Sequence, residues 1–130
     1  MSKKRTLYSS GAPWESTVGY SRAVRVGNTI EVAGTTAMKD GKLIGPSDAY
    51  TQTKCILEII KEAIEGLGGS MNEVVRTRIY VTDITLFEEI GRAHGEYFSD
   101  VRPASTMVEI SGLVNSKMLV EIEATAIVSK

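Results

Sequence analysis

Two segments of the chain carry apolar residues at three- and four-residue spacing, which is the pattern of a helix with one buried face. The first begins near Pro46-Ser47-Asp48, where the residue types favour a helix start, and ends at the glycines of Gly66–Gly69. The second opens with Thr85-Leu86-Phe87-Glu88, the spacing of a capping box, and runs to about Phe98. The predicted apolar stripes consist of Ile56, Ile59, Ile60, Ala63, Ile64 and Leu67 in the first helix and Phe87, Ile90, Ala93 and Tyr97 in the second. Each helix is therefore expected to lie on another element through one face.

Other segments alternate apolar and polar residues or are rich in β-branched residues, and these patterns predict strands. The expected strands are Ala23–Val26, Thr29–Ala33, Val74–Val81, Ser105–Ile110 and Leu119–Val128. The first two flank Gly27-Asn28 and should form a hairpin, and Asp40-Gly41 marks a further tight turn. An order of strands, helix, strand, helix and strands is typical of the α+β class. We therefore expect a mixed β-sheet with two helices on one face.

The second face of this sheet needs another explanation, because two helices cannot cover both faces of five or six strands. In Val74–Val81, alternation places Val75, Thr77, Ile79 and Val81 on one face. The second face is expected to mix aromatic, thioether and charged side chains, namely Arg76, Arg78, Tyr80, Met107, Glu109, Glu121 and Glu123. It is either wetted by solvent, with cross-strand ion pairs between arginines and glutamates, or it forms a subunit interface that contains a polar pocket.

Composition and charge narrow the class of protein. A length of 130 residues corresponds to one domain, so residues 1–130 are expected to form a single domain. A net charge of −1, without a basic stripe, argues against nucleic acid as a partner. The sequence contains neither a run of 18 apolar residues nor the pattern of a secretory signal, so we expect no membrane association. The one cysteine, Cys55, is predicted to be a packing thiol in a cytoplasmic protein.

Five short motifs follow one another over residues 20–128. They are Tyr20-Ser21-Arg22-Ala23-Val24-Arg25-Val26-Gly27-Asn28, Ala33-Gly34-Thr35, Val75-Arg76-Thr77-Arg78-Ile79-Tyr80-Val81-Thr82-Asp83, Arg102-Pro103-Ala104 and Val120-Glu121-Ile122-Glu123-Ala124-Thr125-Ala126. Together they resemble the successive signatures of the Rid (reactive intermediate deaminase, YjgF-like) family. The resemblance implies a chorismate-mutase-like α+β fold and a homotrimer. It also implies three equivalent clefts between subunits, each binding a small-molecule metabolite.

The resemblance also implies which residues line the cleft. Deaminases of this family hydrolyse enamines and imines derived from amino acids. Their ligand-binding tyrosine and glycine fall on Tyr20 and Gly34, and the glutamate near the attacking water falls on Glu121. The arginine that holds the substrate carboxylate falls on Ser105, and a cysteine common two places later falls on Met107. A serine hydroxyl offers one neutral donor where an arginine forms two charge-assisted hydrogen bonds, so we expect poor hydrolysis of amino-acid imines.

Two functions remain open, and they depend on whether another cation reaches the cleft. Arg22 is a candidate ligand-binding residue for this role, and Arg25 and Arg92 are alternatives. With a cation beside Glu121, the chain is expected to be a hydrolase acting on C=N or enamine bonds. Without one, the chain is expected to be a non-catalytic trimer that binds or senses a small molecule.

Cofactor and nucleolytic chemistry find little support in the sequence. The only histidine, His94, lies on the second predicted helix without partner ligands, so we expect a structural residue and no metal site. No cofactor is predicted, since the sequence contains no Gly-rich phosphate loop. Cleavage of RNA needs paired proton-transfer groups and a cationic grip on phosphate, and neither is evident here.

Overall fold

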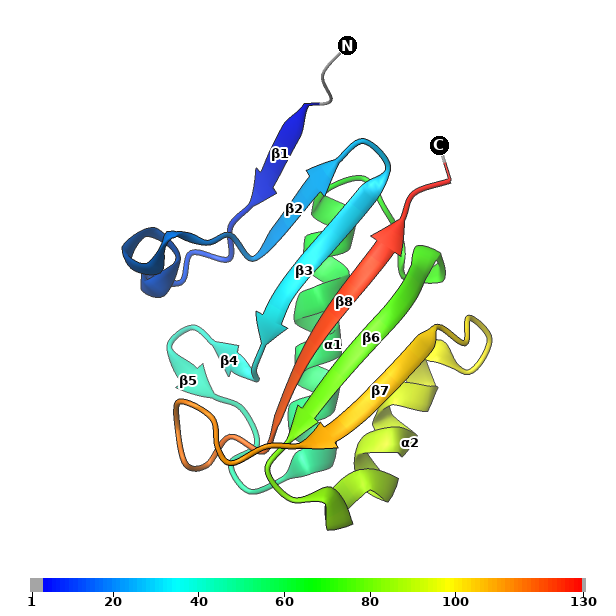
Figure 1. Cartoon of the computed structure of the whole chain (residues 1–130). Helices are drawn as coiled ribbons and strands as arrows, with labels where there is room; N and C mark the ends of the chain where they lie inside the picture. The colour runs from blue at the N-terminus through cyan, green and yellow to red at the C-terminus, as the bar shows by residue number, and fades with distance from the viewer. Residues whose placement is uncertain (1–3, 130) are drawn as a thin grey trace.

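The computed structural model describes residues 4–129 and shows one large sheet with two helices packed on one of its faces (Figure 1). The strands are β1 (Arg5–Tyr8), β2 (Ala23–Val26), β3 (Thr29–Thr35), β4 (Met38–Lys39), β5 (Lys42–Leu43), β6 (Val74–Val81), β7 (Ala104–Glu109) and β8 (Val120–Ile127). The helices are α1 (Ala49–Gly66) and α2 (Phe87–Phe98), with short helical turns η1 (Glu15–Gly19), η2 (Met71–Glu73) and η3 (Ile84–Leu86). The expected α+β class, with two helices on a mixed sheet, is confirmed.

The sheet has six strands in the order β1-β2-β3-β8-β6-β7, and β4 and β5 form a separate two-stranded hairpin. Neighbouring strands are antiparallel except β6 and β7, which run parallel and are joined through α2. A parallel connection needs a crossover, and α2 provides it on the same face as α1 (Figure 1). Neither α1 nor α2 covers the opposite face, which is called the open face below.

The positions of glycine explain the conformations of the two hairpin turns. Gly27 has a φ of 62° while Asn28 has no positive φ, so the β2–β3 hairpin needs its glycine at the first central position. At the β4–β5 turn, both Asp40 and Gly41 have positive φ, of 53° and 77°, which is the requirement of a type I′ turn. The Gly-Asn and Asp-Gly orders in the sequence thus match the turn that each forms.

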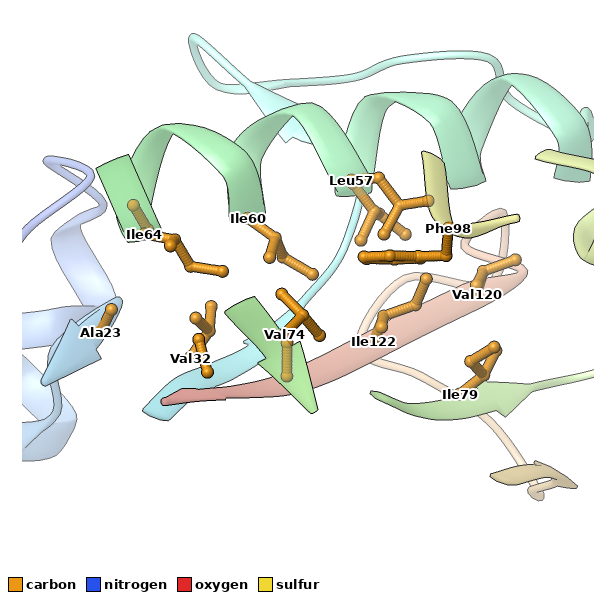
Figure 2. Packing of buried hydrophobic residues seen from close by; sticks show 14 of the residues in the cluster. Ala23, Val32, Leu57, Ile60, Ile64, Val74, Ile79, Phe98, Val120 and Ile122 are labelled. Atoms are coloured by element: carbon orange, nitrogen blue, oxygen red, sulfur yellow. The ribbon is translucent and has the colours of Figure 1, made fainter. Parts of the chain in front are cut away.

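The core lies between the helices and the sheet, and Figure 2 shows its centre. Helix α1 begins after Asp48, whose carboxylate accepts a hydrogen bond from the amide of Thr51 at 3.0 Å. Its buried stripe meets the inward side chains of β3, β6 and β8, and these residues have little or no exposed area: Ile56, Leu57, Ile60, Ala63, Ile64, Val32, Ile79, Val120, Ile122 and Ala124. Burial of this apolar area supplies most of the stabilisation of the fold.

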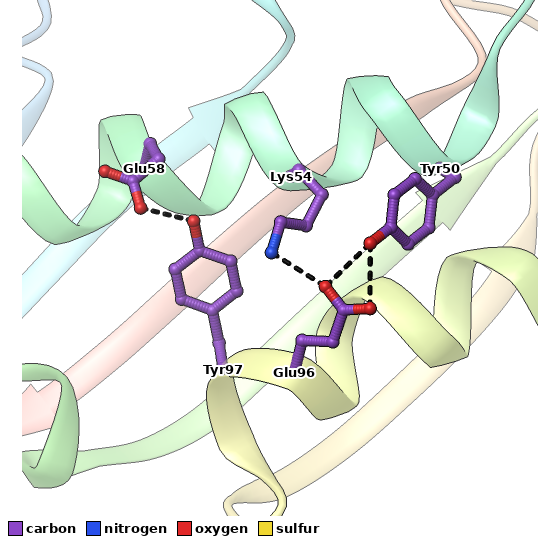
Figure 3. Close-up of polar contacts among 5 residues, drawn as sticks. All are labelled: Tyr50, Lys54, Glu58, Glu96 and Tyr97. Carbon is purple, nitrogen blue, oxygen red and sulfur yellow. Dashed lines mark hydrogen bonds and ion pairs between the residues drawn. The ribbon is translucent and has the colours of Figure 1, made fainter.

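The outer surfaces of the two helices are joined by polar contacts (Figure 3). Glu96 of α2 accepts hydrogen bonds from the Lys54 ammonium and the Tyr50 hydroxyl of α1, each at 2.7 Å. One turn along, the Tyr97 hydroxyl donates to the Glu58 carboxylate. These groups are exposed, so each contact adds little stability. Their geometry instead orients α2 on α1.

One expectation about β6 was wrong. Val75 was expected to face the core, but its side chain is 43% exposed. The register between β6 and β8 shifts between Val74 and Arg76, so Val75 lies on a bulge that breaks the alternation.

The predicted capping box at Thr85 does not form. Asp83 is the capping residue, and its carboxylate accepts hydrogen bonds from the Thr85 amide at 3.0 Å and hydroxyl at 2.6 Å. The turn η3 therefore precedes α2. Phe87, expected on the apolar stripe, is the first residue of α2 and is 55% exposed.

Candidate functional site

The candidate site is built on a bulge in β3. The register between β3 and β8 shifts between Val32 and Thr35, which leaves Ala33 and Gly34 outside the regular pairing. Arg22, 8% exposed, donates from Nη1 to the Gly34 carbonyl at 2.7 Å and to the Thr35 hydroxyl at 3.0 Å. A buried guanidinium thus binds the Gly34 carbonyl and the Thr35 hydroxyl at the bulge.

Gly34 lies directly against the side chain of Glu121 on β8. A Cβ atom at position 34 would be 2.7 Å from Glu121 Oε2 and 2.9 Å from its Cδ. These distances are too short for carbon, so the Glu121 carboxylate occupies space that exists because residue 34 has no side chain. The resemblance to the Rid family pointed to both residues, and the structure shows that they are in contact.

The surroundings of Glu121 alter its protonation. Burial disfavours the charged form and raises the pKa of the Glu121 carboxyl above its usual value, and repulsion from Glu123 adds to this increase. The positive charge of Arg22 acts in the opposite direction and is the smaller effect. A carboxylate whose pKa is raised toward neutrality is a stronger acceptor of protons, as a general base requires.

Tyr20 completes the cluster. Its hydroxyl accepts a hydrogen bond from Arg22 Nη2 at 3.3 Å, and the guanidinium carbon lies 5.5 Å from the ring centroid. The structure therefore brings Tyr20, Arg22, Gly34 and Glu121 together. Arg22, a candidate ligand-binding residue, donates from Nη1 and Nη2 to Gly34, Thr35 and Tyr20 of its own chain. These hydrogen bonds stabilise the bulge in β3.

A concavity of about 650 Å³ opens beside this cluster on the open face. Arg78 and Glu123, which lie 3.9 Å apart, are among its lining residues, together with Tyr20 and Ala33. The Tyr80 hydroxyl also donates to Glu123, at 3.2 Å. Of the cross-strand ion pairs expected between arginines and glutamates, Arg78–Glu123 is present, whereas Arg76 donates to the Thr106 hydroxyl at 2.8 Å.

Ser105 and Met107 do not join this cluster within one chain. Ser105 pairs with Thr77, and Met107 with Ile79, in the parallel β6–β7 ladder. Residues paired in this way point to the same face, and Thr77 and Ile79 are buried beneath the helices. Met107 and Glu109 were expected on the open face. That assignment was wrong, since Met107 packs against the core and the Glu109 carboxylate accepts from the Ile84 amide at 2.8 Å.

Ser105 instead belongs to a chain of polar side chains that the sequence analysis missed. The Thr77 hydroxyl donates to Ser105 Oγ at 2.8 Å and lies 3.0 Å from His94 Nε2. Thr77 was assigned only to the apolar face, and a polar residue among buried positions was the signal that could have identified it. His94 is half-buried, and burial lowers its pKa.

The other candidate cations are engaged elsewhere. Arg25 donates from Nη1 to the Leu67 carbonyl at 2.7 Å, at the end of α1. Arg92 lies over the Tyr50 ring at 4.6 Å, on the outer surface of the helices. Neither arginine contacts Glu121 within the chain. Among residues 4–129, the structure shows no group of three or more acidic, histidine or cysteine side chains that could hold a metal ion.

Comparisons with known proteins agree over nearly the whole chain. The model of the family described as endoribonuclease L-PSP matches residues 6–128. A RutC family protein of Pyrococcus abyssi is 36% identical over 126 residues, covering 95% of this chain and 96% of its own length. An uncharacterized protein of Streptomyces coelicolor is 41% identical over 117 residues, with coverages of 90% and 87%.

Solved structures show the same fold. A crystal structure from Mycobacterium tuberculosis, of a member of the YjgF/YER057c/UK114 family, superimposes with a TM-score of 0.88 at 46% identity and covers 96% of this chain and 100% of that one. A protein of unknown function from Pseudomonas aeruginosa gives a TM-score of 0.84 at 31% identity, with coverages of 98% and 94%. No helix within residues 4–129 has both the length and the apolar character needed to cross a membrane.

Proposed function

Because the chain belongs to the Rid (YjgF-like) family, we propose that it works as a homotrimer that hydrolyses small imines or enamines in clefts between its subunits. The observation that carries this proposal is the Glu121 carboxylate, packed on Gly34 with a raised pKa and flanked by Tyr20 and Arg22. The substrate is one that does not depend on a bidentate carboxylate grip, since Ser105 stands where the resemblance implies an arginine.

The open face supports assembly of the trimer. Three of its apolar side chains are largely exposed in a single subunit: Leu7 at 58%, Ile127 at 50% and Val108 at 42%. They lie on β1, β8 and β7, so exposed apolar side chains occur at both edges and in the middle of the open face. Covering such a surface with other subunits is favourable, because it removes apolar area from water.

The trimer would also bring together groups that one chain separates. Glu121 lies on the open face, whereas Ser105 points to the helix side of the edge strand β7. Both can touch one ligand only if they come from neighbouring subunits. A cleft between subunits meets that condition, with Glu121 from one subunit and Ser105 from the next.

In the proposed reaction, water adds to the C=N bond and ammonia leaves. Glu121 accepts a proton from water as the water oxygen bonds to the imine carbon, and it passes that proton to the nitrogen to form a carbinolamine. It then carries the hydroxyl proton of the carbinolamine to the nitrogen as the C–N bond breaks. The products are a carbonyl compound and ammonia, and Glu121 ends in its original state.

The experiment is an imine-hydrolysis assay on wild type and Glu121→Gln, with imines generated in situ by an amino-acid oxidase. Removing the proton carrier should lower the rate by about a hundredfold or more, while the fold and trimer are retained. Glu62→Gln is the matched control, because Glu62 is exposed on the outer surface of α1 and contacts none of the site residues. Equal rates for wild type and Glu121→Gln, or a monomer by light scattering in place of three times 14.1 kDa, would contradict the proposal.

A second candidate function is a non-catalytic trimer that binds a small molecule. It is favoured by the state of the arginines, since Arg22 is directed at the bulge and Arg25 at the end of α1. In that case a ligand would bind with similar affinity to wild type and Glu121→Gln, and neither would hydrolyse imines. Ribonuclease activity is not part of the proposal, because Glu31, Glu121 and Glu123 on the open face would repel phosphate.

A further inference from the structure

Three polar side chains from three different elements form a continuous chain at the β7 edge of the sheet. His94 of α2 lies 3.0 Å through Nε2 from the hydroxyl of Thr77 on β6. That hydroxyl lies 2.8 Å from the Oγ of Ser105 on β7. Thr77 is fully buried and Ser105 is exposed. The chain therefore leads from the interior between helix and sheet to the surface.

The directions of these hydrogen bonds follow from the number of protons. When the Thr77 hydroxyl donates its single proton to Ser105 Oγ, its oxygen can only accept from His94, whose Nε2 then carries the proton. His94 is held in place by Phe98, whose ring centroid is 4.7 Å away. Because Ser105 Oγ already accepts a proton, its own proton is free to be donated outward.

The two arginines near Ser105 each donate a hydrogen bond to another group. Arg76 donates to the hydroxyl of Thr106, at 2.8 Å, on the opposite face of β7. Arg102, two residues before β7, donates from Nε to the Ser99 carbonyl at 3.2 Å. The donor that Ser105 itself presents to a ligand is thus neutral and oriented by Thr77. Such a donor pairs well with an uncharged acceptor and poorly compensates the desolvation of a carboxylate.

We propose that Ser105 contacts the ligand and donates its hydrogen bond to an uncharged acceptor, such as a carboxamide or ketone oxygen, and that Thr77 and His94 are positioning residues for this hydroxyl. The inference rests on the proposed function in placing Ser105 at the cleft. It deepens that function by naming the substrate class: imines whose far end carries a neutral amide or carbonyl group in place of a carboxylate.

The test is a binding titration with a matched pair of stable ketones, 2-oxobutanamide and 2-oxobutanoate, followed by NMR on the assembled protein. These differ only in whether the far end is a neutral amide or a carboxylate. Wild type should bind the amide about fivefold more tightly, as expected for one net hydrogen bond. Ser105→Ala should remove this preference, because it removes the outward donor.

Variants of the positioning residues separate orientation from simple packing. Thr77→Val keeps the shape of the side chain but breaks the chain, and it should reduce the preference to about twofold or less. Thr77→Ser keeps the hydroxyl and should restore it. His94→Gln retains an N–H donor and His94→Leu does not, so the first should keep more of the preference. Thr106→Val is the control, since its hydroxyl lies on the other face of β7.

The measured quantity is a ratio of two affinities, which a general loss of stability would not change. Tighter binding of 2-oxobutanoate by wild type, an unchanged ratio in Thr77→Val, or no binding of either ketone at millimolar concentration would overturn the inference. Preferential binding of the amide by a protein that hydrolyses no imine would support the inference and refute the proposed hydrolysis.

Discussion

Replacing Gln52 with leucine removes three hydrogen bonds from the interior of the protein. Gln52 lies on α1 with no exposed area, and its Nε2 donates to the carbonyls of Gly45 at 3.0 Å and Lys117 at 2.9 Å. Its Oε1 accepts from the Leu119 amide at 2.8 Å. One side chain thus holds the loop before β8 against the start of α1, through contacts 65 and 67 residues apart in sequence.

The expected loss follows from which backbone groups lose a partner. Gly45 keeps a second hydrogen bond, because its carbonyl also accepts from the Asp48 amide at 2.9 Å. The Lys117 carbonyl and the Leu119 amide lose the partner that Gln52 provides. An unsatisfied buried group costs about 1–3 kcal/mol, so two such groups, partly reached by water, should lower the free energy of unfolding by about 3 kcal/mol. For a chain of this length the melting temperature should fall by about 10 °C.

The assay is urea denaturation and thermal melting at one fixed protein concentration, since assembly also stabilises the folded state. Glu62→Leu is the matched control, because Glu62 is exposed on the same helix and its replacement should change stability by less than about 0.5 kcal/mol. The loop before β8 should also be cleaved faster by protease in Gln52→Leu. A loss below about 1 kcal/mol would refute the reasoning, since it would mean that leucine packing or water replaces all of these bonds.

Three further changes test the site and its surroundings. Gly34→Ala should displace the Glu121 carboxylate, because Oε2 would lie 2.7 Å from the added Cβ. The rate of imine hydrolysis should fall by about tenfold or more while the melting temperature stays near normal. An unchanged rate would show that the contact between residue 34 and Glu121 is unimportant. Cys55→Ala should keep turnover within a few-fold of wild type, because burial raises the pKa of the thiol and keeps it protonated; abolished turnover in a folded variant would contradict this. Burial lowers the pKa of His94 below 6.5, so the unfolded state binds more protons and stability should decrease as the pH falls through about 6.5 toward the folded-state pKa. Denaturation at a series of pH values should show a flatter profile for His94→Gln, and identical profiles would be evidence against a neutral, buried imidazole.

The helices and central strands could be predicted because their buried positions are apolar and recur with the period of a helix or a strand. Helix α1 was recognised from Ile56, Ile60 and Ile64, and all three are fully buried. The strand β1 was missed, since its residues are mostly exposed and so carry no alternation of apolar and polar positions. Its residue Arg5 pairs with Val26 of β2. A strand on the sheet edge is specified by its backbone pairing, which a hydropathy pattern does not reveal.

For the candidate site, motif resemblance indicated Tyr20, Gly34 and Glu121, and the structure places these residues together. It did not indicate the direction of Arg22, because a guanidinium can serve a ligand or its own backbone equally well from the same position. The bulge in β3 decides this, since it exposes the Gly34 carbonyl to Nη1. A bulge depends on the pairing of two strands about ninety residues apart, and no local pattern encodes it.

The sequence by itself determined the class of the fold, the core face of α1, the turn glycines and the absence of an arginine at position 105. The tertiary structure alone decided which way β7 faces. Alternation showed that Ser105 and Met107 share a face, but either face was compatible with that pattern. The parallel register with β6 made the choice by pairing Ser105 with Thr77, and it thereby linked a surface hydroxyl to His94. Such a register is set by the crossover through α2 and by packing of the whole layer, which are non-local interactions.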